Sequence, residues 1–262
     1  MLTVQYDGAG FHGWQLQPER RTVQGTLEEA LSRLADRPRT VLGSGRTDAG
    51  VHALGQVASV DMPSKWSPTE LQRALNATLP ADIWIEAVHA ASPDFHPRYD
   101  AVSRTYTYKV GTQARAASPF HRRWCWALGE ELDVALLGEG AARIIGRHSF
   151  EAFSKAGQPE RGEMCSVASA EWSEWALGHR FTVTADRYLH HMVRYLVGTM
   201  VDVARGRRAS SDIARLLHKD SDVVTSPPAP PQGLFLSHVE YPEHVLLGDG
   251  QSIPPPRRAA TV

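Results

Sequence analysis

The chain has 262 residues, 42% of them hydrophobic and 22% charged, and a formal net charge of −1. This composition is typical of an ordinary soluble protein with one large domain or two moderate ones, and it excludes a uniformly cationic nucleic-acid binder. No apolar run approaches the length of a membrane helix and no secretory signal is visible, so we expect no membrane partner. Cys125 and Cys165 show no metal or redox spacing, which favours a reducing, cytoplasmic location.

The first hundred residues predict the order strand, helix, strand, strand, helix, strand. Strands are indicated by alternating side chains, and helices by apolar residues at helical spacing behind capping residues. This order is the split βαβ pattern. The predicted segments are a strand at 2–6, a helix at 22–36, strands near 40–44 and 56–61, a helix that begins at Ser67 and Pro68, and a strand at 83–88.

The second half repeats this theme loosely. Its clearest element is the helix predicted at 189–204, whose apolar residues form an unbroken stripe. Two similar halves predict an α+β fold with two split βαβ (ferredoxin-like) subdomains, 1–102 and 103–242. The Pro-rich segment 243–262 is predicted to be a disordered tail. The other segments predicted here are strands at 104–110, 123–128, 167–175, 179–186 and 234–240, and helices at 133–145 and 211–218.

A glycine-hinged loop, Gly43–Ala53, lies between two of the predicted strands and carries one carboxylate, Asp48. Glycine reaches backbone angles that other residues reach only at a cost, and a polar loop held by rigid strands is a common place for chemistry. The alternative is a plain connection whose Asp and Thr side chains satisfy local backbone groups. The pattern alone leaves both interpretations open.

The nonapeptide Gly45–Ala53 resembles the signature loop of the tRNA pseudouridine synthase A family, in which the aspartate is the covalent nucleophile. Further segments match that family in the same order, from the start of the chain to about Tyr241. Several motifs in register are far more specific than one short motif. The matching segments are Tyr6–Gly8, Phe11–Gln15, Asp94–Arg98, Arg104–Tyr108, His190–Arg194, Val197–Gly198 and Ala229–Leu236.

The resemblance implies isomerisation of uridine to pseudouridine in the anticodon stem-loop of tRNA, at positions 38, 39 and 40. It also implies a mostly antiparallel sheet shared by the two subdomains, a central RNA-binding cleft and a homodimer. The reaction is neither an oxidation nor a hydrolysis, so we expect no metal and no cofactor. Whether the aspartate attacks the ribose C1′ or the uracil C6 stays open.

A nucleophilic carboxylate must be ionised, so Asp48 needs a cationic partner or hydrogen-bond donors. Arg194 stands among the apolar residues of the predicted helix 189–204, one turn from the small Gly198. From the pattern alone, the favoured interpretation is an arginine that extends to solvent from a half-buried helix. The resemblance assigns Arg194 to pair with Asp48.

Three further residues have roles that only the resemblance specifies. Strand alternation puts Tyr106 and Tyr108 on one face, and the resemblance assigns Tyr106 to base stacking and proton transfer. It implies that Leu234 forms an apolar wall under the base and that Arg46 faces the RNA. Without it, Tyr106 and Leu234 are ordinary packing residues and Arg46 forms a loop salt bridge.

Other chemistries fit the sequence less well. The Gly-rich loop has neither dinucleotide nor phosphate-loop spacing, and no nucleophile elbow is present. His190 and His191 are adjacent, so on a helix they point apart and cannot share a metal. Two alternatives remain: a non-catalytic RNA-binding module of split βαβ fold, and an Asp-dependent hydrolase. One departure from the family is the missing Thr-Arg pair at Glu163–Val167, which puts one RNA contact in doubt.

Overall fold

The computed structural model describes residues 1–155 and 162–246, and these form two compact units. The first unit contains Met1–Val102 together with the chain from Phe235 onward, and the second contains Ser103–Leu234. The sequence places residues 234–240 in the second subdomain. In the structure this strand, β10 (Leu234–Glu240), pairs in parallel with a strand of the first unit. β10 thus pairs with a strand that lies far away from it in the chain.

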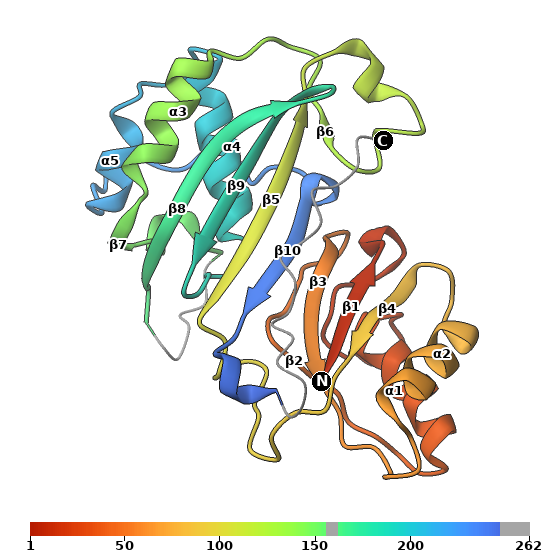
Figure 1. Ribbon diagram of the computed structural model, residues 1–262. Coiled ribbons are helices and arrows are strands. Elements are labelled where there is room, and N and C mark those ends of the chain that lie inside the picture. Colours follow the sequence, from red (N-terminus) through yellow and green to blue (C-terminus); the bar gives the residue numbers. More distant parts are fainter. Residues whose placement is uncertain (156–161, 247–262) are drawn as a thin grey trace. The chain divides into compact units, whose positions relative to one another are not determined.

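The first unit is a sheet covered by two helices (Figure 1). β1 lies in the middle and pairs antiparallel with both β3 and β4, while the two-residue β2 and the parallel β10 pair with β3. The predicted order of strands and helices is confirmed. The elements are β1 (Leu2–Tyr6), α1 (Val23–Ala35), β2 (Leu42–Gly43), β3 (His52–Ser59), α2 (Pro68–Thr78) and β4 (Ile83–Val88).

Both helices of the first unit begin where the sequence predicts. The Thr22 side chain accepts a hydrogen bond from the backbone N–H of Gly25, which satisfies one of the free donors of the first turn of α1. Ser67 and Glu70 form a reciprocal capping box at the start of α2. The helices bury leucines at helical spacing against the sheet, among them Leu27 and Leu75.

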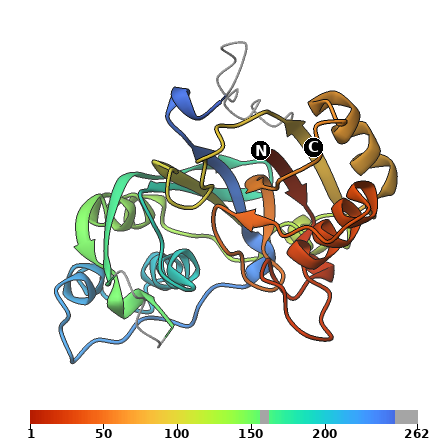
Figure 2. The same cartoon turned by 90° about the horizontal axis from the view of Figure 1, so that it is seen from below.

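The second unit has an antiparallel sheet in the order β5, β9, β8, β7, with the short β6 parallel to β5. Figures 1 and 2 show its three α-helices gathered on one face of this sheet. The α+β class and the mostly antiparallel pairing are confirmed. The elements are β5 (Ser103–Gly111), β6 (Trp126–Ala127), α3 (Val134–Arg143), β7 (Gly146–Ser149), β8 (Met164–Trp175), β9 (Gly178–Ala185), α4 (Met192–Ala204) and α5 (Asp212–Leu217).

Three details of the prediction are wrong. β7 is missed because it is a four-residue edge strand with polar Arg147 and His148 at its centre, so it shows no apolar alternation. The strand predicted at 123–128 is reduced to the two residues of β6. The helix predicted from residue 189 begins at Met192, because His191 adopts a left-handed backbone conformation with φ of 65°.

The predicted disordered tail is also wrong for its first residues. Val245 is buried, its carbonyl accepts a hydrogen bond from the Ser92 backbone N–H, and Leu246 forms a β-bridge with Ala91. Residues 247–262 lie outside the described part of the chain. None of the described helices has the length and apolar character needed to span a membrane.

Two helical glycines lead to opposite predictions. A Cβ on Gly198 in α4 would lie 2.2 Å from the Pro227 carbonyl oxygen, whereas a Cβ on Gly138 in α3 would meet no described atom within 4 Å. We expect Gly138→Ala to raise the free energy of unfolding by about 0.5–1 kcal/mol, because alanine is the better helix former. Gly198→Ala should lower it by about 1–3 kcal/mol, because backbone must move. Urea unfolding of both variants tests the pair, and a stabilising Gly198→Ala would contradict the close approach.

Candidate active site

The loop that carries Asp48 is fixed by its neighbour Thr47, whose side chain points into the first unit. Thr47 is buried, and its hydroxyl shares a hydrogen bond of 2.8 Å with the Tyr6 hydroxyl on β1. The Thr47 carbonyl accepts a hydrogen bond of 3.0 Å from the Trp14 backbone N–H. The side chain and the backbone of Thr47, the residue before Asp48, are therefore both hydrogen-bonded to other segments.

A second buried side chain, Gln56 on β3, holds the start of the loop. Its amide group donates to the Gly45 carbonyl at 2.8 Å and to the Tyr6 hydroxyl at 3.4 Å, and its carbonyl accepts from the Ser44 hydroxyl at 2.8 Å. Burial raises the pKa of Tyr6 to about 12, so its hydroxyl stays neutral at physiological pH. The network is therefore uncharged and does not titrate near neutrality.

Glycines let the N-terminal segment pack directly against the loop. A Cβ on Gly8 would lie 2.0 Å from the Val51 carbonyl oxygen, and one on Gly13 would lie 2.7 Å from that of Thr47. Only glycine fits these two approaches, and Gly13 also has a positive φ of 89°. The loop thus packs against the backbone of the N-terminal segment. A backbone contact cannot be lost by a side-chain rotamer change, so the packing fixes the loop.

His52, the first residue of β3, joins the same packing. Its ring is buried, stacks on Phe235 with 4.8 Å between centroids, and accepts a hydrogen bond at Nδ1 from the Gly8 backbone N–H. Accepting at Nδ1 requires a lone pair there, so this arrangement corresponds to neutral His52 with its proton on Nε2. An Asp7 carboxylate oxygen lies 3.1 Å from Nδ1 and becomes an ion-pair partner only if His52 is protonated.

Arg46 and Asp48, on either side of Thr47, are less buried than Thr47 itself. Arg46 is exposed and Asp48 is partly buried. The Asp48 carbonyl accepts from the Val51 backbone N–H at 3.1 Å, which closes a turn that includes Gly50 at a φ of 77°. The structure thus places a carboxylate at the surface of a rigid, glycine-hinged loop, where a nucleophile needs to be.

Tyr106 and Tyr108 share one face of β5, as predicted, and both are buried. Tyr106 is 9% exposed and Tyr108 is 0% exposed. The Tyr108 hydroxyl donates to the Pro230 carbonyl at 2.7 Å, and burial raises its pKa well above the usual value. The Tyr108 hydroxyl is thus bound to the backbone of another segment, and Tyr106 is the slightly more exposed tyrosine of this pair.

Tyr188, which the sequence analysis does not single out, supports Tyr106. The two rings meet edge to face, with 4.8 Å between centroids and 76° between planes. The buried Tyr188 hydroxyl lies within hydrogen-bond distance of two carbonyls, those of Arg104 at 3.0 Å and Val183 at 2.9 Å. Burial raises the pKa of Tyr188 well above its usual value. The one signal in the sequence was an aromatic residue just before a helix, and that signal is weak.

Arg194 on α4 is partly buried and anchored on one side. Its Nε donates to the Ala229 carbonyl at 2.7 Å, and the Ala229 backbone N–H donates to the Arg194 carbonyl at 2.9 Å. Gly198, one turn further on, leaves room for the Pro227 backbone, so the space expected there is filled by the chain itself. The Nε bond thus fixes one edge of the Arg194 guanidinium against the segment that contains Ala229.

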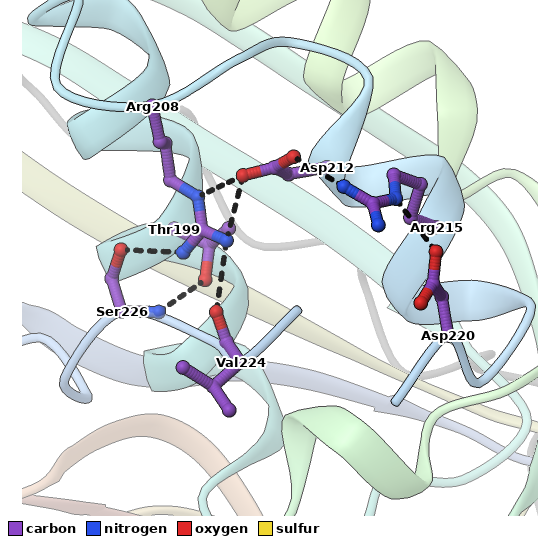
Figure 3. A network of polar contacts seen from close by, with 7 residues as sticks. All are labelled: Thr199, Arg208, Asp212, Arg215, Asp220, Val224 and Ser226. Atoms are coloured by element: carbon purple, nitrogen blue, oxygen red, sulfur yellow. Dashed lines mark hydrogen bonds and ion pairs between the residues drawn. The ribbon is translucent and has the colours of Figure 1, made fainter. Parts of the chain in front are cut away.

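The segment before Ala229 is held by a polar network (Figure 3). Arg208 donates to the Asp212 carboxylate at 3.0 and 3.1 Å, to the Ser226 hydroxyl at 3.0 Å and to the Val224 carbonyl at 2.8 Å. The Ser226 backbone N–H donates to the Thr199 hydroxyl on α4 at 3.3 Å. These contacts fix the chain as it approaches the residues that bind Arg194 and Tyr108.

Leu234 ends this segment and is buried. A Cβ on the preceding Gly233 would lie 2.6 Å from the Tyr108 ring, so the backbone runs directly against that ring. Leu234 is thus positioned by the contacts of Tyr108 and Gly233. Tyr106, Arg194 and Leu234 all belong to the second unit, and Arg46 and Asp48 belong to the first.

His190 and His191 do not point apart as helical spacing predicts. Their ring centroids lie 4.1 Å apart, because both residues precede the first residue of α4 and His191 has a left-handed backbone. Helical spacing therefore does not separate them.

The segment Glu163–Val167 lacks the arginine that the family commonly has there. Arg187 donates to the carbonyls of Gly162 at 2.9 Å and Met164 at 3.4 Å.

Comparison with known proteins identifies the family of the chain. The sequence model of a family described as tRNA pseudouridine synthase matches residues 2–100 and 141–242. The tRNA pseudouridine synthase A of Moorella thermoacetica is 42% identical, with 92% of this chain and 98% of the relative aligned. That of Methylacidiphilum infernorum is 39% identical over 92% and 94%. That of Bacteroides thetaiotaomicron is 37% identical over 94% and 91%.

Proposed function

Because the chain belongs to the tRNA pseudouridine synthase family, we propose that it isomerises uridine to pseudouridine in tRNA with Asp48 as the nucleophile. The isomerase activity on tRNA follows from the family, and the assignment of Asp48 is our own. The observation that carries this assignment is the buried contact of Thr47 with Tyr6, which holds the next residue, Asp48, on a rigid loop.

The reaction cuts the glycosidic bond, rotates the uracil and joins its C5 to the same ribose carbon. No electron is gained or lost overall and no water is consumed, so a carboxylate nucleophile and proton transfer suffice. The base must first leave the stack, at a cost of about a few kcal/mol. A carboxylate already fixed in position adds no ordering cost of its own to this step.

The remaining roles rest on the resemblance and on the geometry of each residue. We propose that Arg194 pairs with Asp48; its Nε bond to Ala229 would hold the guanidinium in a defined plane. Tyr106 would stack on the uracil and assist proton transfer, with its ring held by Tyr188. Leu234 would form an apolar wall, and the exposed Arg46 would contact the RNA.

The substrate details are further proposals. The resemblance supports the anticodon stem-loop as the target, at tRNA positions 38, 39 and 40, and a homodimer as the active form. A cytoplasmic location is supported by the two free, buried cysteines, which suit a reducing compartment. A non-catalytic RNA-binding module is not favoured, because such a module has no need of a carboxylate on a preformed loop.

The first test is Asp48→Asn with unmodified tRNA transcripts, followed by chemical mapping of pseudouridine. The amide has nearly the same size but cannot form the covalent ester-type intermediate, so we expect folding like the wild type and no pseudouridine. Wild-type protein should form pseudouridine in the anticodon stem-loop of the same transcripts. Appreciable turnover by folded Asp48→Asn would remove Asp48 from its role.

A second prediction concerns Arg194→Lys, which keeps the charge but not the planar pair of donors. Lysine cannot hold a carboxylate in two parallel bonds, and a displacement of about an ångström can cost on the order of a hundredfold in rate. Loss of the Nε bond to Ala229 should lower stability by only about 0.5–1.5 kcal/mol. Single-turnover rates and urea unfolding on one preparation separate the effects; a wild-type rate would place Arg194 outside the site.

A further inference from the structure

A basic segment that projects from the second unit has no part in the function proposed above. No aspartate or glutamate occurs between Asp100 and Glu130, although the chain as a whole has a net charge of −1. Residues 112–125, which we call the basic arm, lie in this stretch and follow the last residue of β5. The arm carries three arginines, Arg115, Arg122 and Arg123, and all three are exposed.

The arm has a fixed backbone. At its base, the backbone N–H groups of Thr112 and Gln113 both donate to the Leu177 carbonyl, at 2.9 and 3.2 Å. Ala116 and Cys125 pack with Leu177 in a small buried cluster. Near its tip, the Ser118 carbonyl accepts from the backbone N–H groups of residues 121 and 122, at 3.0 and 2.9 Å. The arm is thus a preformed structure.

This structure presents an apolar ring to solvent. Phe120, at the tip, is 83% exposed, more than any other large hydrophobic residue in the described part of the chain. Arg122 and Arg123 follow it, and the Arg123 guanidinium lies 5.5 Å from the centre of the Trp124 ring. Among the described residues, no carboxylate forms an ion pair with Arg115 or Arg122.

We propose that the basic arm is a second RNA contact, which binds tRNA away from the reacting uridine. The proposal rests on the proposed function for the identity of the RNA. Exposed arginines suit the phosphate backbone, and an exposed aromatic ring suits the face of an unpaired base. Faces of paired bases are hidden within a stem, so Phe120 would take a nucleotide from a loop or an end.

The arm would bind a different nucleotide from the uridine that is proposed to stack on Tyr106. β5 continues for five residues beyond Tyr106 before the arm begins, which corresponds to roughly 16 Å at about 3.3 Å per residue. Contact between the arms of two copies would bring like charges together, because the arm has several cations and no carboxylate. Charge therefore favours RNA over a contact between two arms.

Binding of an unmodified tRNA transcript by the full chain tests the proposal. Phe120→Ala should weaken affinity about tenfold, as expected for loss of one stacked base. Arg122→Ala should lower the steepness of the dependence of log Kd on log salt by about 0.7–0.9, as expected for loss of one phosphate contact. In both variants KM should rise while the single-turnover rate at saturating tRNA stays unchanged.

Two variants serve as matched controls: Arg143→Ala removes an exposed arginine of α3, and Val224→Ala removes an exposed apolar side chain. Both should bind like the wild type. Arm variants that bind like these controls would overturn the proposal. So would sedimentation that shows Phe120→Ala splitting an RNA-free dimer, because the arm would then be a subunit interface. Binding of tRNA that depends on the arm supports this proposal, whether or not the wild type forms pseudouridine. Absence of pseudouridine with the wild-type protein would contradict the proposed function and not the role of the arm.

Discussion

The hydrogen bond between the Tyr6 and Thr47 hydroxyls is the contact on which the proposed site depends. A single such bond contributes only about 0.5–1.5 kcal/mol to stability, but leaving a buried hydroxyl unpaired costs about 1–3 kcal/mol. Gln56 reaches the same Tyr6 hydroxyl and also binds the loop backbone, so the hydroxyls form part of one buried network. Any other loop conformation must break several of these bonds together, and Asp48 is held through its neighbour.

The second unit uses the same strategy with different groups. There the chain between α5 and β10 is bound by side chains of a helix and a strand, Arg194 and Tyr108, each of which hydrogen-bonds a backbone carbonyl. Backbone packs directly on Gly198 and against the Tyr108 ring, with no side chain between. The backbone of the chain between α5 and β10 thus helps to hold Arg194, which has a proposed role in catalysis. Precise positioning of a catalytic side chain requires such supporting contacts.

Much of this was predictable from the sequence, and the reasons are local. Thr22 and Ser67 mark helix starts by capping chemistry that acts within three residues, and the alternation along β5 correctly paired Tyr106 with Tyr108. The errors have non-local or weak local causes. β7 shows no apolar alternation, and the backbone of His191 turns left-handed just before α4.

The supporting residues were harder to find than the site itself. Tyr6 and Gly13 stand in segments that match the family, but nothing in the sequence says that they contact Thr47. Tyr188 gave only a weak signal, because its contact with Tyr106 is edge to face with a strand far away in the chain. A resemblance identifies residues that meet substrate more readily than residues that position them, because supporting contacts are a property of the folded structure.

The most direct test of the account is the single-turnover rate of Asp48→Glu at saturating tRNA. Glutamate keeps the charge and the nucleophilic group but moves the carboxylate by about an ångström from a backbone that the Thr47 contacts hold in place. We expect a folded, tRNA-binding enzyme that is slower by on the order of a hundredfold or more. A rate close to that of the wild type would show that the loop adapts freely, and would contradict the claim that rigid positioning of Asp48 carries the function.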